Sequence, residues 1–245
     1  MSYILLAYRT IFFQPILNAL VFLYNVIPGH DIGIAIILIT ALIRLILWPL
    51  QAKSLKSQKA MQELQPRLKA LQAEHKGNKE ALAKATMELY AAEKVSPFSS
   101  CLPLLIQLPF LIAIYRALRD GLASKQLDLL YGFVHNPGTV NPNFLGFMSL
   151  AAPSIPLAVL AGAAQFWQSK MLISTRPTVK SPGAKDEDTM ALVNKQMTYF
   201  MPVMTVFIGA SLPGGLALYW LMTTLLTILQ QHLAFRGIKH VDQKS

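Results

Sequence analysis

The sequence predicts an all-α integral membrane protein with five transmembrane helices around a hydrophilic groove, a cytoplasmic helical hairpin and an N-terminal interfacial helix. Two observations carry most of this prediction. Hydrophobic residues make up 53% of the chain and charged residues only 14%, whereas soluble domains carry about 25% charged residues. The charges, with a formal net value of +10, lie mainly between and after long apolar runs, which is typical of a multi-pass membrane protein.

The first element, residues 1–31, is predicted to be an extracytoplasmic helix in the membrane interface. Its apolar stretch at 10–28 is interrupted by Gln14, Pro15, Asn18 and Asn25. These residues make it a poor lipid-buried span, while its aromatic residues suit the headgroup boundary. A sixth span or an uncleaved signal anchor is the alternative.

The second element, residues 32–50, is predicted to span the bilayer although it contains Arg44. The stretch is otherwise uncharged and long enough for a spanning helix. A charged side chain near the centre of such a helix costs roughly 2.5–3.5 kcal/mol on insertion scales, so it persists mainly where it faces water, a partner or a ligand. The alternative is that the long side chain of Arg44 snorkels to the interface near Leu50.

Residues 51–97 are predicted to form the cytoplasmic hairpin. They are rich in helix formers, and their leucines recur at spacings that place them on one helical face. Gly77 and Asn78, in the sequence His75-Lys-Gly-Asn78, predict the turn between two charged arms. This apolar stripe is narrow and can build little core. We therefore expect the two arms to be mobile and available to a partner. A helix pair that merely connects two spans is the alternative.

Four further apolar stretches predict the remaining spans, at residues 98–118, 146–169, 198–212 and 216–235. An extracytoplasmic loop at 119–145, a cytoplasmic loop at 170–197 and a basic cytoplasmic tail at 236–245 complete the chain. With Leu50 on the cytoplasmic side, most Lys and Arg residues face inward. The N terminus is therefore predicted outside and the C terminus inside.

Prolines and polar side chains within the predicted spans indicate one hydrated side of the bundle. Each proline frees a backbone carbonyl that needs a neighbouring helix, a hydroxyl or water in lipid. The candidate groove residues are Arg44, Thr40, Gln107, Gln165, Gln168, Thr223, Thr224 and Thr227. The alternative for the Thr and Gln residues is hydrogen bonding between helices, their commoner use in membranes.

No catalytic residue, metal site or cofactor is predicted. Cys101 is the only cysteine, which excludes an intramolecular disulfide and favours a small apolar filler. The spans lack the His-Glu-x-x-His, paired-aspartate and Gly-x-Ser-x-Gly signatures of intramembrane proteases. A channel or carrier in which Arg44 binds an anion is the alternative function, although the lack of intramembrane Asp or Glu argues against proton coupling.

Several motifs, in a fixed order, resemble those of the YidC-type membrane protein insertases. They are Arg44 followed by Trp48-Pro-Leu50, Leu64-Gln-Pro66, residues 93–109 (EKVSPFSSCLPLLIQLP), Phe200-Met-Pro202, residues 212–220 (LPGGLALYW), Gln230-Gln231 and Arg236-Gly237. The likeness covers roughly residues 10–238. It departs at Ser96, Ser99-Ser100 and Trp48, where the family usually has Asn, a small pair rich in Gly, and Tyr.

The resemblance implies five core spans in a bacterial plasma membrane, around a groove that contains Arg44 and is closed on the outside. It implies an insertase or chaperone that moves short polar segments of nascent membrane proteins across the bilayer, without a nucleotide. Nascent membrane proteins and the lipid bilayer are the implied partners; the ribosome, the signal recognition particle pathway and the Sec translocon are further candidates, and DNA is not. No large extracytoplasmic domain is expected, as in compact members, and a pure assembly chaperone stays open.

Overall fold

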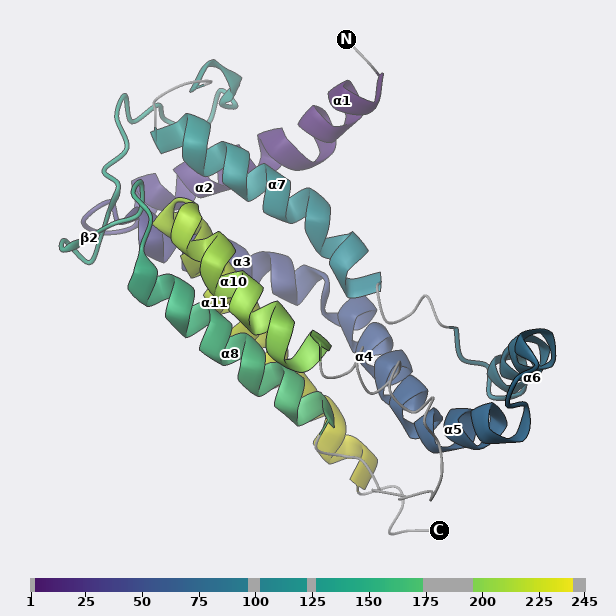
Figure 1. Cartoon of the computed structure of the whole chain (residues 1–245). Coiled ribbons are helices and arrows are strands. Elements are labelled where there is room, and N and C mark those ends of the chain that lie inside the picture. Colours follow the sequence, from purple (N-terminus) through teal and green to yellow (C-terminus); the bar gives the residue numbers. More distant parts are fainter. Residues whose placement is uncertain (1–2, 97–101, 123–126, 174–195, 240–245) are drawn as a thin grey trace.

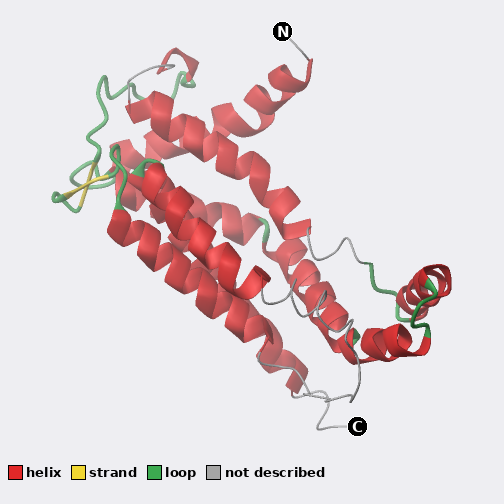
Figure 2. Ribbon diagram, in the orientation of Figure 1, coloured by secondary structure: helices red, strands yellow, loops and turns green. Residues whose placement is uncertain are grey.

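The structure, a computed structural model, describes residues 3–96, 102–122, 127–173 and 196–239. The first of these ranges holds α1 (Tyr3–Tyr8), η1 (Arg9–Phe13), α2 (Gln14–Val26), α3 (Ile32–Ile46), α4 (Trp48–Glu63), α5 (Gln65–Glu74) and α6 (Lys79–Ala92). The others hold α7 (Leu102–Leu122), η3 (Leu127–Leu129), β1 (Asn143–Phe144), β2 (Met148–Ser149), α8 (Ile155–Ile173), η5 (Gln196–Phe200), α10 (Met201–Ser211) and α11 (Gly214–Lys239). Helices therefore dominate, as predicted, and a two-stranded sheet lies at one end (Figure 2).

Some predicted elements fall wholly or partly outside the described residues. These are the start of the predicted span at 98–118 with Cys101, the loop at 170–197 and the tail at 236–245. Within the described part, one helix, Leu5–Val26, is long and apolar enough to cross a membrane, and the bent pair α3 and α4–α5 would be a second. Five spans therefore stay a prediction.

Polar side chains of the N-terminal helix hold the loop that follows α7. The Asn18 side chain donates to the carbonyl of Leu129 at 3.2 Å and accepts the N–H of Tyr131 at 2.6 Å. Gln14 also donates to Leu129, at 3.1 Å, and Asn25 donates to the carbonyl of His135 at 2.7 Å. These bonds satisfy the groups that make this helix look like a poor span, so its polarity alone does not place it in the interface. An interfacial position stays a prediction.

The bundle is closely packed where small residues let helices approach. A Cβ added to Gly162 of α8 would lie 2.4 Å from Cγ2 of Val206 in α10. One added to Gly215 of α11 would lie 2.9 Å from Cδ1 of Leu118 in α7 and 3.3 Å from Cδ1 of Ile36 in α3. Close approach at small residues is a common basis of helix association in membranes. α8, α10 and α11 accordingly lie side by side in Figure 1.

A bend separates α3 from α4. The helix that was predicted to continue to residue 50 ends at Ile46, and the segment Trp48–Glu74, which comprises α4 and α5, leaves it at an angle of 70°. Pro49 is in the first turn of α4, where its missing N–H costs little. Backbone bonds still cross the bend, from Leu47 to the Ile43 carbonyl at 3.0 Å and from Gln51 to the Leu47 carbonyl at 2.9 Å. The two helices are therefore joined directly, without a loop.

α5 and α6 stand away from the bundle (Figure 1). Asn78 caps α6 by accepting the Ala81 N–H at 3.0 Å, and Gly77 has φ +87° in the turn between the helices. An ion pair joins Arg67 to Glu93. α6 buries none of its described side chains. A cytoplasmic location for this pair stays a prediction.

The opposite end of the bundle carries β1 and β2. Asp31 caps α3, accepting the N–H groups of Gly33 and Ile34 at 2.8 and 3.0 Å, and also accepts the Leu145 N–H at 2.6 Å. Residues 150–152 cover the start of α11, because its first N–H groups bind carbonyls of that segment. α8 begins at Ile155, later than the start of the predicted span at 146–169, since residues 143–149 form the β-hairpin of β1 and β2. We call this the hairpin end, and the other the α4 end.

Candidate functional site

Arg44 lies near the end of α3, just before the bend, where its side chain binds one other helix and lies near a second. Its Nη1 donates a hydrogen bond to Oε1 of Gln51 in α4. The guanidinium also lies in the neighbourhood of the Tyr219 side chain of α11. Arg44 is partly buried, whereas only 6% of the Gln51 surface is exposed. The bend explains the contact, because it brings the first turn of α4 back toward the last turn of α3.

Tyr219 connects the same site to a fourth helix. Its side chain is 2% exposed, and its hydroxyl accepts a hydrogen bond from Nε2 of Gln107 in α7. α3, α4, α7 and α11 thus meet at Arg44, Gln51, Gln107 and Tyr219, which we call the polar junction. No ion pair joins Arg44 to a carboxylate among the described residues. The partners of the guanidinium among those residues are therefore neutral.

The four predicted threonines are buried, and three of them are bonded to their own helices. The hydroxyl of the fourth, Thr223, has no hydrogen-bond partner among the described residues. Thr40 donates to the Ile36 carbonyl at 2.6 Å, and Thr224 and Thr227 donate to the carbonyls four residues before them at 2.9 and 2.8 Å. Such bonds use the hydroxyl proton and leave the oxygen as an acceptor. Tyr219, Thr223 and Thr227 follow one another at four-residue spacing. They form a polar stripe along one face of α11.

The two predicted glutamines of α8 do not belong to the polar junction. Gln165 accepts a hydrogen bond from Thr205 of α10, so it joins α8 to α10. Gln168 is partly buried one turn further along α8. For Gln165, the structure agrees with the alternative that a membrane glutamine serves as a bond between helices.

Sequence reasoning missed two members of the junction. Gln51 was assigned to the cytoplasmic hairpin because it follows the predicted span. It lies seven residues after Arg44, which is about two helical turns, so both side chains would lie on one face of a continuous helix. Tyr219 was noticed only within a family motif, and its four-residue spacing from Thr223 was the available signal. Further along, Nε2 of Gln230 donates to the Trp48 carbonyl at 3.2 Å, and Ser54 and Gln231 are also buried. Buried polar groups therefore continue from the junction along α4 and α11.

Residues 22–242 match a family model described as "60Kd inner membrane protein". Over 212 residues the chain is 38% identical to proteins named membrane protein insertase YidC from Francisella tularensis subspecies novicida, tularensis and holarctica. The alignment covers 86% of this chain and 34% of each relative. The chain thus spans about a third of the length of the curated relatives it matches.

Proposed function

We propose, because this chain belongs to the 60Kd inner membrane protein family, that it inserts other proteins into a membrane. Family membership confirms the resemblance predicted from the motifs. The relatives carry the name membrane protein insertase, and nothing in that name supports the alternative of a channel or carrier. Since the chain covers only part of those relatives, the activity is assigned here on the strength of the polar junction.

One observation carries the proposal: Arg44 is held where four helices meet, with only neutral partners among the described residues. An acidic residue brought to ~4 Å from the guanidinium gains about 4 kcal/mol at an effective dielectric near 20, before desolvation is subtracted. Such an attraction is enough to recruit the polar tail of a client and small enough to release it. Arg44 therefore acts as a transient attractor for acidic tails.

The path that we propose for the client tail follows the polar stripe of α11. It begins at the α4 end, near Gln230, and passes Thr227 and Thr223 to reach the junction at Tyr219. We assign the α4 end to the cytoplasm from the predicted distribution of Lys and Arg. α3, α7, α8, η5 with α10, and α11 are the proposed five spans, with the N terminus outside and the C terminus inside.

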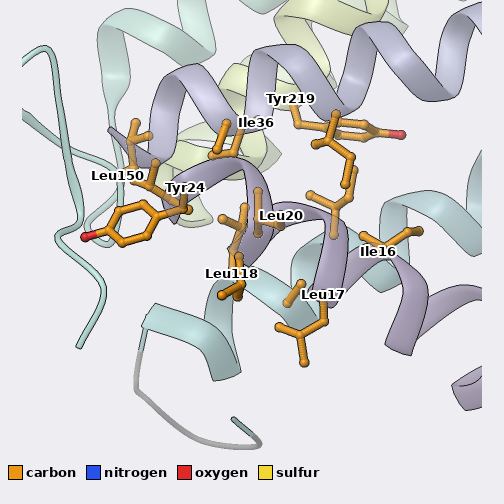
Figure 3. Close-up of a cluster of buried hydrophobic side chains, with 14 of the residues drawn as sticks. Ile16, Leu17, Leu20, Tyr24, Ile36, Leu118, Leu150 and Tyr219 are labelled. Carbon is orange, nitrogen blue, oxygen red and sulfur yellow. The ribbon is translucent and has the colours of Figure 1, made fainter. Parts of the chain in front are cut away.

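Beyond the polar junction, the hairpin end has an apolar core that a polar client tail does not enter. Figure 3 shows Ile36, Leu118, Leu150 and Leu20 gathered in one buried cluster between the helices. The path is therefore a half-channel from the cytoplasm, and the remaining distance is crossed when the client's apolar helix moves sideways into lipid. An inside-negative potential then favours outward transfer of each acidic charge by about 2.3 kcal/mol per 100 mV.

Nascent membrane proteins and the bilayer are the partners that this mechanism requires. α5 and α6 support a recruiting role, because they stand apart from the bundle with exposed charged faces. The ribosome, the signal recognition particle pathway and the Sec translocon are the recruited partners that we predict. The mechanism needs neither a catalytic residue nor a metal.

The decisive experiment uses the purified chain alone in vesicles with a short single-span client. Insertion is measured by protection of the client's tail from added protease, and ion conductance is recorded on the same vesicles. We expect insertion above the level in empty vesicles and no conductance. Conductance without insertion would replace the insertase with a channel.

A further inference from the structure

The hairpin end carries an apolar projection. Phe147 N–H binds the Phe144 carbonyl at 3.2 Å and closes a tight turn between β1 and β2. Leu145 and Phe147, on this turn, are 57% and 75% exposed, and Phe133 of the neighbouring loop is 78% exposed. We call Leu145 and Phe147 the apolar edge. Large apolar side chains this exposed on a loop call for a partner.

The turn is held in place from its inner side. The Leu145 N–H binds the Asp31 carboxylate at 2.6 Å, and the Phe144 ring covers Gly33 so closely that an added Cβ would lie 2.1 Å from Cδ2 of the ring. The Leu150 N–H binds the Pro142 carbonyl at 2.8 Å behind the strands. Leu145 and Phe147 are therefore presented outward by a fixed support.

Leu145 occupies backbone space that suits other residues better. Its φ is +50°, and the following Gly146 has φ +79°. In this left-handed region glycine and asparagine are favoured, whereas leucine is disfavoured. A strained backbone that presents an exposed leucine is an observation from which a functional role for the side chain can be inferred.

The surrounding sequence identifies the partner. Residues 129–169 contain no Asp, Glu, Lys or Arg, although a water-exposed stretch of this length would carry about ten at ordinary composition. The uncharged stretch continues from the turn into α8, whose exposed residues include Ile155, Val159 and Leu160. Because this uncharged surface continues onto the apolar surface of α8, lipid is the partner that matches the apolar edge.

The level of the turn fits the headgroup boundary. Asp31 ties it to the start of α3, and residues 150–152 tie the following segment to the start of α11, close to where α8 begins. If these three helices span the bilayer, as proposed above, their ends mark one membrane interface. Aromatic residues are enriched at that depth.

We infer that the apolar edge inserts into the lipid of the leaflet at the hairpin end and anchors that end of the bundle in the interface. Leu145 and Phe147 enter the boundary between headgroups and acyl chains. This inference rests on the proposed spans and is independent of the insertase activity.

The test places a polarity-sensitive NBD fluorophore at the edge. In a Cys101→Ala background, Phe147→Cys is labelled and reconstituted as one copy per lipid nanodisc, with spin-labelled lipids that quench at shallow or deep positions. The control is Glu80→Cys, at an exposed position of α6. We expect several-fold stronger quenching by shallow spin labels at 147 than at 80, and several-fold weaker quenching by aqueous iodide.

Iodide quenching at 147 equal to that at 80, without quenching by spin-labelled lipid, would overturn the inference. It would show that the apolar edge lies in water, where it could bind another protein or a second copy of this chain. A nanodisc that holds one copy contains neither of these partners. Leu145→Cys gives an independent reading if Phe147→Cys fails to fold, as judged by its melting temperature against Cys101→Ala alone. Both readings are made without a client, so they stand or fall separately from insertion.

Discussion

The two ends of the bundle are built from the same helices but differ in what they bury. Near the hairpin end, α3, α7 and α11 bury Ile36, Leu118 and Gly215 against one another. Further along, the same three helices bring Arg44, Gln107 and Tyr219 together. The side chains that these helices bury against one another thus change from apolar to polar between the two ends. In the proposed mechanism, the apolar end excludes water and the polar end supplies a positive charge.

The comparison predicts the largest loss of stability at the apolar end. Leu118 is fully buried, so Leu118→Ala should lower the free energy of unfolding by about 2–5 kcal/mol through lost burial and a cavity. Leu229→Ala, at a half-exposed position of α11, is the control and should change it by less than about 0.5 kcal/mol. Unfolding in mild detergent measures both. Equal effects would mean that the apolar end does not hold the bundle.

At the polar end, Arg44→Ala should change selectivity. We expect insertion of a client with an acidic tail to fall about tenfold, or ~1.4 kcal/mol, because only that client loses the Coulomb attraction. A neutralised tail should lose little, and Arg44→Lys should keep much of the activity, since it keeps a cation. The measurement is protease protection of the same client with either tail. An equal loss for both tails would assign Arg44 a structural role.

Gln51→Glu sharpens the role of charge at the junction. The new carboxylate would sit on the Arg44 guanidinium and neutralise it, so insertion of the acidic client should fall almost as far as in Arg44→Ala, by several-fold. Gln51→Leu is the control that removes the hydrogen bond without adding charge. In an Arg44→Ala background Gln51→Glu should have little further effect, because the two changes act on one interaction. Additive losses would contradict the coupling.

The smallest effect on the bundle is expected from α5 and α6. Replacing residues 65–92 by a short Gly/Ser linker should change the melting temperature of the purified protein by no more than about 2 °C, because these helices add little to the core. The same variant should lose insertion only when the client is delivered by a cellular fraction. A collapse of the melting temperature would show that the pair belongs to the core.

The sequence by itself determined what depends on local pattern. Composition and long apolar runs indicate a helical membrane protein, and ordered motifs place it in its family. Arg44 could be selected as the first candidate site residue because its surroundings are uncharged, a property of the segment alone. The turn formers Gly77 and Asn78 likewise lie between α5 and α6, because turn preference is set by a few neighbouring residues.

Only the tertiary structure decided which residues meet. Gln107 and Tyr219 are 112 positions apart, and their contact depends on how α7 and α11 cross. Gln51 was predicted in the cytoplasmic hairpin, but the bend at Leu47 makes it the partner of Arg44. Gln165 was predicted in the groove, but the packing of α8 on α10 places it against Thr205. Periodicity tells which face of a helix is polar, but it carries no information on which distant helix that face will touch.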